Sequence, residues 1–227
     1  MTPTIYIRCL LLPVLLWTAA ARGQGFREDL AKVKASFGHE KGFSATVEVR
    51  YYKGAGDELP ATVKKGNVKR LGTYYYSLFD GREYLVNPSY SVFADREHRV
   101  MVVSGTQKNG AQKDGFSAPE IDEKTERNSI IRRSTDGHTV IYAIGPKTGG
   151  TGTVLELDRD GQRLRKVTYF GGNSYGRTEI QYTYPATETA LTKEEFSEAR
   201  FFTKNKKTLV PAAKYAAFEI NDQTQQK

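Results

Sequence analysis

One motif in the chain has the spacing of a catalytic serine. Gly172-Asn-Ser174-Tyr-Gly176 matches the G-x-S-x-G pattern of a nucleophile elbow, in which a strand-to-helix turn exposes the serine. That motif also needs an acid and then a histidine later in the chain, and no histidine follows His138. Because the segment falls between two predicted strands, we interpret it as a glycine-rich hairpin turn.

Two other segments imitate ligand loops. Residues 145–152 are glycine-rich like a phosphate loop, but they lack the Gly-Lys-Ser/Thr ending and lead into a predicted strand. Asp158, Asp160 and Gly161 have the spacing that begins a calcium loop, without the glutamate that would complete it. We interpret both segments as connections between strands.

The histidines give no metal-ligand pattern. His39, His98 and His138 stand at least 40 positions apart in polar, turn-like contexts, so surface positions are expected. Carboxylate pairs such as Glu194-Glu195 fall on predicted helix surfaces. The sequence therefore predicts no catalytic set, no metal and no cofactor, and the protein is expected not to be an enzyme.

The elements around these motifs are mainly strands. Between Tyr74 and Val103, four short runs rich in aromatic and β-branched residues are separated by turns at 80–81, 87–88 and 95–97. This pattern predicts an antiparallel meander, which forms a wall and carries no reaction centre.

The same period of two recurs on both sides of the meander. Phe43 to Tyr51 alternates apolar and polar residues, and 62–71 continues as a more polar strand that Gly66 breaks. Asp136-Gly137 is a strong hairpin signal. Later strands are predicted at 129–133, 140–144, 154–158, 164–170, 177–184, 201–202 and 215–220. The total of about ten or eleven strands is typical of an antiparallel barrel or sandwich.

Helices are predicted at three places. Phe26, Leu30, Val33 and Phe37 form one apolar stripe that ends before Gly38. Ser117 to Glu120 resembles a helix start inside a long irregular excursion, and Thr192 with Glu195 suggests a capping box before a brief helical turn. We expect the excursion, residues 106–128, to act as a flap or cover.

The N-terminal residues predict export. Met1 to Arg8 carries one positive charge, and the apolar run Cys9 to Ala21 is shorter than the roughly 20 residues that a spanning helix needs. We interpret residues 1–23 as a signal peptide cleaved before Gln24, with Ala19 and Ala21 as a second option for the cleavage motif, and residues 24–227 as a single domain. Cleavage would remove the only cysteine, so the mature chain would depend on a hydrophobic core.

The chain is basic, with a formal net charge of +8. Its lysines and arginines are spread in small clusters, and each cluster is interpreted as solvated surface. For an exported protein, lipid head groups or acidic proteins are the expected anionic partners, and nucleic acid is not.

The aromatic residues of the predicted sheet could either line a cavity or fill a core. The chain has 14 tyrosines and 11 phenylalanines, many at alternating strand positions. Tyrosine combines a large apolar ring with a polar tip, which suits the wall of a cavity that stays soluble when empty. The alternative is that these rings fill a core.

The order of elements resembles that of the periplasmic outer-membrane lipoprotein carriers, LolA and its receptor relative LolB. Lys69-Arg-Leu-Gly-Thr-Tyr-Tyr-Tyr76 is similar to a family segment of the form Lys-Arg-Pro-x-x-Phe-Arg-Trp, and Asn87-Pro88 follows at a similar place. The likeness covers most of residues 24–227 as architecture and about 60 residues as motif. Tyr75 stands where the family has an arginine thought to hold the lid closed, and Leu71 stands where it has proline.

The resemblance implies an incomplete antiparallel β-barrel with an N-terminal helix, a helical cover and a concave apolar face. By resemblance, a periplasmic monomer would carry lipoprotein acyl chains or another lipid between an inner-membrane donor and an outer-membrane acceptor. Its expected cavity lining is Val47, Val49, Tyr51, Tyr74, Tyr76, Tyr84, Val86, Val100, Val102, Tyr142 and Leu155. The alternative is a non-catalytic cell-envelope interaction or scaffold protein whose barrel is filled by its own side chains.

Overall fold

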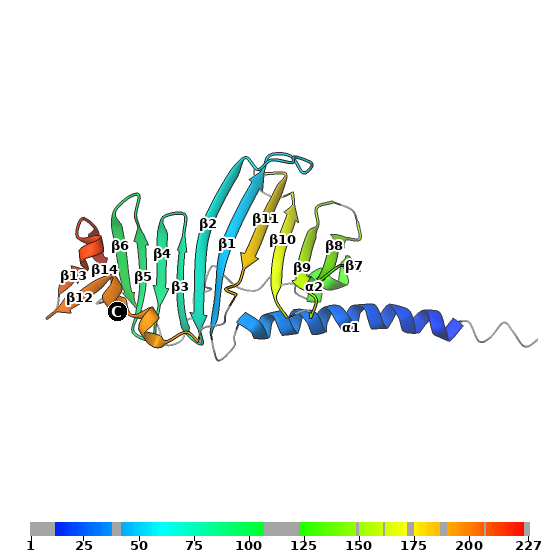
Figure 1. The fold of residues 1–227 in the computed structure, drawn as a ribbon, viewed down its shortest axis with the longest axis horizontal. Coiled ribbons are helices and arrows are strands. Elements are labelled where there is room, and N and C mark those ends of the chain that lie inside the picture. Colours follow the sequence, from blue (N-terminus) through cyan, green and yellow to red (C-terminus); the bar gives the residue numbers. More distant parts are fainter. Residues whose placement is uncertain are drawn as a thin grey trace, which may run out of the picture.

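One open sheet of twelve strands dominates the computed structural model (Figure 1). Its strand order is β14-β6-β5-β4-β3-β2-β1-β11-β10-β9-β8-β7, so β14 and β7 are its two edges. All neighbouring strands pair antiparallel except β14, which runs parallel to β6. Because the edges do not pair with each other, the predicted incomplete barrel is confirmed. The structure describes residues 12–37, 42–106, 123–148, 150–160, 162–171, 175–186, 190–206 and 208–224, with side chains from Gly25 onward except that of Glu123.

The strands follow the predicted order closely up to Thr183. Each predicted alternation in this part forms a strand. The strands are β1 (Phe43–Tyr52), β2 (Thr62–Leu71), β3 (Tyr74–Phe79), β4 (Arg82–Val86), β5 (Tyr90–Asp95), β6 (Val100–Gly105), β7 (Ser129–Asp136), β8 (Thr139–Pro146), β9 (Thr153–Asp158), β10 (Leu164–Phe170) and β11 (Arg177–Thr183).

The C-terminal part contains more elements than the sequence predicts. β12 (Phe202–Asn205) and β13 (Thr208–Pro211) form a separate hairpin, and β14 (Glu219–Asp222) joins the main sheet. The predicted strand at 215–220 is wrong in its first half, because Ala213–Tyr215 is a 3-10 turn, η3. Each of the three strands has only four residues, too short for alternation to be recognised.

Gly66 does not break β2, contrary to prediction. The strand is continuous, and Gly66 pairs with Val47 on one side and Phe79 on the other. A Cβ placed on Gly66 would lie 2.3 Å from the carbonyl oxygen of Leu78 and 2.6 Å from the Phe79 ring. The neighbouring ring therefore covers the site where a side chain is missing, and the ladder stays intact.

The first hydrophobic core lies between the sheet and helix α1 (Leu12–Phe37). Phe26, Val33 and Phe37 are buried against residues of β1 and β8–β11, which confirms the predicted apolar stripe. The Phe26 ring meets the edge of Tyr142 at a centroid distance of 5.0 Å, and Phe37 stacks on Phe43 at 4.4 Å. Figure 1 shows α1 below β8–β11, with its N-terminal part projecting past β7.

The second core lies on the opposite face of β3–β6. Here the chain folds back through η1 (Lys193–Phe196), η2 (Glu198–Arg200), the β12–β13 hairpin and η3, and it buries Phe196, Phe201 and Tyr215 against the sheet. The predicted capping box is confirmed at the start of η1, where Thr192 and Glu195 cap each other. Neighbouring residues of β3 serve the two cores separately, since Tyr75 belongs to the first and Tyr76 to the second.

Several sequence predictions fall on residues outside the described ranges. These are residues 1–11 of the predicted signal peptide, the helix start at 117–120, His39, and Ser174 of the G-x-S-x-G motif. Of the predicted cover, only residues 106 and 123–128 are described, and they include the short helix α2 (Glu123–Arg127). Helix α1 runs through the predicted cleavage site, so cleavage before Gln24 would leave its second half on the sheet. Among the described residues, no helix is both long and apolar enough to span a membrane.

Candidate functional site

The predicted lining residues fall into three groups, of which the first lies beneath α1. Val47, Val49, Tyr142 and Leu155 are buried in the first core, with exposed fractions of 6% or less. Tyr51 is half-buried at its margin. The Tyr142 hydroxyl donates a 2.6 Å hydrogen bond to Oδ2 of Asp29 on α1. These side chains would line a cavity only if α1 moved away from the sheet.

The second group lies on the other side of the sheet. Tyr74 packs on Phe196 with ring centroids 5.7 Å apart, and Tyr76 is buried in the second core. Alternation along β3 explains this position, because residues 74 and 76 share one face and residue 75 has the other. The structure therefore does not bring Tyr74 and Tyr76 together with Val47 and Tyr142.

The third group forms a continuous apolar surface on β4, β5 and β6. Tyr84, Val86, Val100 and Val102 are half-buried, on the same sheet face as the first core. Register places Phe93 between Tyr84 and Val102, as a partner of both. We call the surface made by Tyr84, Val86, Phe93, Val100 and Val102 the β4–β6 face. No described helix crosses it.

Sequence reasoning missed the central residue of the β4–β6 face. Phe93 has 37% of its surface exposed, on the face of β5 that the C-terminal segment does not cover. The available signal was its place in the meander, since Phe93 alternates with buried Val92 and Ala94. Alternation alone could not show which of the two faces is covered.

The β4–β6 face has an apolar centre and polar margins. Ser91 Oγ donates to the Tyr84 hydroxyl at 3.1 Å, and Arg82 pairs with Asp95 at 3.3 Å where β4 begins and β5 ends. On the other side, the Tyr75 ring lies 6.0 Å from the Tyr84 ring and joins the face to the first core. An apolar surface with a polar rim can hold a hydrocarbon chain and orient its polar end.

Behind this face, Glu83 is a buried carboxylate in the second core. Its Oε1 accepts hydrogen bonds from Arg96 at 2.5 Å and from Lys214 at 2.9 Å, and its Oε2 accepts one from Tyr76. Burial by itself would raise the pKa of Glu83, but these bonds and one from Tyr215 outweigh it and lower the pKa to about 2. The carboxylate is therefore ionised and fully engaged, which suits a structural clamp better than proton transfer.

One group of side chains in the described part of the chain has metal-ligand types within reach of each other. Asp95, Glu97 and His98 lie in the β5–β6 turn, with one ligand atom of each within 4.8 Å of the others. The Asp95 carboxylate already accepts the backbone N–H groups of Glu97 and His98 and pairs with Arg82. These contacts show that Asp95 stabilises the conformation of the β5–β6 turn.

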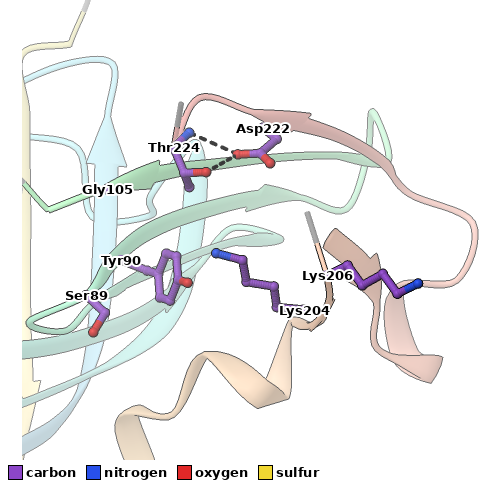
Figure 2. A pocket seen from close by; sticks show the side chains of 7 residues that line it. All are labelled: Ser89, Tyr90, Gly105, Lys204, Lys206, Asp222 and Thr224. Carbon is purple, nitrogen blue, oxygen red and sulfur yellow. Dashed lines mark hydrogen bonds between the residues drawn. The ribbon is translucent and has the colours of Figure 1, made fainter. Parts of the chain in front are cut away.

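A polar cavity of about 450 Å³ lies beside the β12–β13 hairpin (Figure 2). It is formed by residues from β5, β6, β12 and β14, and in Figure 2 the Lys204 side chain points toward Tyr90. The Asp222 carboxylate accepts hydrogen bonds from the backbone N–H and the hydroxyl of Thr224. The Lys204 ammonium group makes this cavity better suited to an anion than to a hydrocarbon chain, whereas the Lys206 side chain points away from Tyr90 (Figure 2). Its lining is Ser89, Tyr90, Gly105, Lys204, Lys206, Asp222 and Thr224.

Comparison with known proteins does not assign the chain to a family. No family model matches the sequence, and no curated protein matches it. An uncharacterised conserved protein from Thermus thermophilus matches with a TM-score of 0.48 at 9% identity, over 88% of this chain and 99% of that chain. MucB matches with a TM-score of 0.45 at 14% identity, over 78% of this chain and 62% of the MucB chain. The Pseudomonas aeruginosa MucA/MucB complex matches with a TM-score of 0.39 at 14% identity, over 75% of this chain and 59% of that chain. The chain thus spans about three fifths of the MucB chains.

Proposed function

We propose that the protein is an exported, non-enzymatic carrier that binds an acyl chain of a lipid or lipoprotein on the β4–β6 face. The observation that carries this proposal is a half-exposed apolar surface across three strands of an open sheet, centred on Phe93. The resemblance to lipoprotein carriers supports it, as does the predicted signal peptide. A periplasmic location follows from the same proposal.

The energetics of an acyl chain favour such a surface. Each methylene left in water costs about 0.8 kcal/mol, so a soluble carrier needs an apolar surface that shields several of them. Tyrosine and valine side chains cover the chain from one side, while the Tyr84 hydroxyl, which accepts a hydrogen bond from Ser91, can donate its own proton to an ester or amide group.

Helix α1 would extend the site in this proposal. Tyr75 connects the β4–β6 face with Val47, Val49 and Tyr142, which the helix now covers. If α1 lifts as a lid, the apolar surface grows from three strands to most of the sheet. The arginine latch of the carrier family is replaced by Tyr75, so the Tyr142–Asp29 hydrogen bond is the contact that would hold α1 closed.

A second function class is favoured by a different observation. Val47, Tyr142 and Leu155 have 1% or less of their surface exposed and belong to the same core as Phe26, Val33 and Phe37 of α1. A core filled in this way suits a scaffold or interaction protein of the cell envelope that never opens. Such a protein would bind no lipid.

The deciding experiment is native mass spectrometry of the full chain purified from the envelope of its own cells. Co-purifying acyl species are expected, and they should be lost about tenfold or more when Phe93→Glu or Val102→Glu places a charge on the face. Val63→Glu is the matched control, because Val63 is an exposed valine of β2 whose side chain lies on the opposite face. Protein that is ligand-free after gentle purification would reject the carrier and leave the scaffold.

A further inference from the structure

Strand β7 ends the twelve-stranded sheet with a long, open edge. It pairs with β8 in continuous register from Ser129 opposite Pro146 to Asp136 opposite Thr139, and no described strand pairs with its other side. Every residue from Arg132 to Asp136 is exposed. The opposite edge, β14, has only four residues. A long free edge is a template for pairing with another extended chain.

The ladder shows which backbone groups of β7 point away from β8. Just before the strand, the Lys147 N–H donates to the Asn128 carbonyl at 2.9 Å, so Asn128 belongs to a hydrogen-bonded pair of the β7–β8 ladder. In antiparallel strands such pairs alternate with pairs whose amide and carbonyl groups point outward. Residues 131, 133 and 135 therefore direct N–H and C=O groups toward the open edge.

An apolar hollow lies directly beside this edge. It has a volume of about 280 Å³ and sits on the sheet face opposite α1. Ile130 of β7 lines it with 47% of its surface exposed, together with Ala143, Val154 and Phe170. A side chain from a strand added next to β7 would reach this hollow, because neighbouring strands lie about 4.8 Å apart.

Charge selects the kind of chain that fits. Arg132 also lines the hollow, and it has no ion-pair partner among the residues that the structure describes. Arg133 follows it and reaches the Tyr142 hydroxyl at 3.3 Å. If a second copy of this chain paired its β7 antiparallel to this one, centred on Arg132 and Arg133, arginines of the two copies would lie opposite each other. Like charges directly opposite each other destabilise the pairing of two strands. An acidic segment would meet complementary charge instead.

We propose that β7 docks an extended, acidic segment of a partner protein, which adds to the sheet edge as a further strand. Ile130 and Arg132 are two positions apart and share a face, so the segment needs an apolar residue and an acidic residue at the same spacing. The apolar side chain enters the hollow, and the carboxylate pairs with Arg132. This site is separate from the β4–β6 face and does not depend on the acyl-chain proposal.

The first test uses fluorescence anisotropy with the full chain and labelled peptides of about eight residues. The acidic peptide consists of repeats of the sequence Thr-Val-Thr-Glu, and the matched basic control peptide consists of repeats of Thr-Val-Thr-Lys. The acidic peptide should bind saturably and more tightly than the basic one. Arg132→Glu should weaken the acidic peptide about tenfold and improve the basic one, since it reverses the charge opposite. Equal binding of the two peptides to the unmodified protein, or no saturable binding of the acidic one, overturns the proposal.

The second test separates strand addition from simple charge attraction. Thr135→Pro removes an outward N–H without removing a hydrogen bond to β8, so the sheet should stay folded while peptide binding is lost. Thr135→Ala is the control and should bind normally, and thermal unfolding checks both variants. Hydrogen exchange at 131, 133 and 135 should slow when the acidic peptide is added. Unchanged binding by a folded Thr135→Pro protein, or exchange that does not slow at these amides, overturns strand addition.

Discussion

The Tyr76 hydroxyl donates a 2.9 Å hydrogen bond to the carboxylate of Glu83 inside the second core. Both residues face the C-terminal segment from neighbouring strands, and Lys214 of that segment reaches the same carboxylate. A charge buried at this position requires all of its partners at once, because an unpaired buried charge is costly. The network therefore fixes where the C-terminal segment lies on the sheet.

Glu83→Gln should destabilise the protein by about 2 kcal/mol at neutral pH, because the hydrogen bonds to a charged acceptor are lost. Chemical denaturation followed by fluorescence measures this change. Glu97→Gln is the control, since Glu97 is exposed in the β5–β6 turn and should change little.

Acid should remove the same stabilisation. The folded-state pKa of Glu83, about 2, lies below its ordinary value of 4.5, so its contribution is complete above pH 4.5 and is lost as the pH falls toward 2. Glu83→Gln should therefore flatten the fall in stability across that range. A variant with an unchanged acid profile would contradict the role given to this network.

Gly66→Ala should destabilise the protein by about 2 kcal/mol, because a methyl group would overlap the Leu78 carbonyl and the Phe79 ring. Gly105→Ala is a suitable control, since a Cβ at Gly105 meets no atom of the described residues within 4 Å. Thermal unfolding compares the two. Equal melting temperatures would mean that β2 and β3 separate readily.

Tyr142→Phe should cost about 1 kcal/mol and loosen α1, because it removes the hydrogen bond to Asp29 and leaves the aromatic packing in place. Limited proteolysis within residues 25–37 should then become faster. In Tyr169→Phe, which alters a partly exposed tyrosine of β10, proteolysis should be unchanged.

Exported protein should begin at Gln24, because the small residues Ala21 and Gly23 precede the predicted cleavage site. Intact-mass measurement of the protein from the envelope fraction gives its first residue directly. A mass that includes residues 1–23 would contradict the predicted signal peptide.

Much of the sheet was predictable because local burial dictates local alternation. Phe43 to Tyr51 alternates since α1 covers one face of β1, and the stripe on α1 repeats with the helix period for the same reason. The meander from Tyr74 to Val103 likewise has turns wherever Asp-Gly or Asn-Pro stands.

The candidate site was less predictable because it depends on contacts between distant residues. Alternation places Tyr76 on one face of β3, but that face is buried only because residues beyond 190 fold back over β3–β6. Tyr52 stands on the polar side of its strand, yet it is buried because Arg177 lies 3.8 Å from its ring centroid and Glu179 accepts a hydrogen bond from its hydroxyl. Neither partner can be deduced from the sequence around the tyrosine.

The second core also sets an order of events during biogenesis. Its sheet side comes from residues 74–103, whereas its cover comes from residues beyond 190, and β14 must still reach β6 to complete the edge. A chain emerging from a ribosome or a translocation channel would therefore hold Leu85, Val92 and Met101 exposed until the residues beyond 190 had appeared. Chaperone protection of the nascent chain is needed most during that interval.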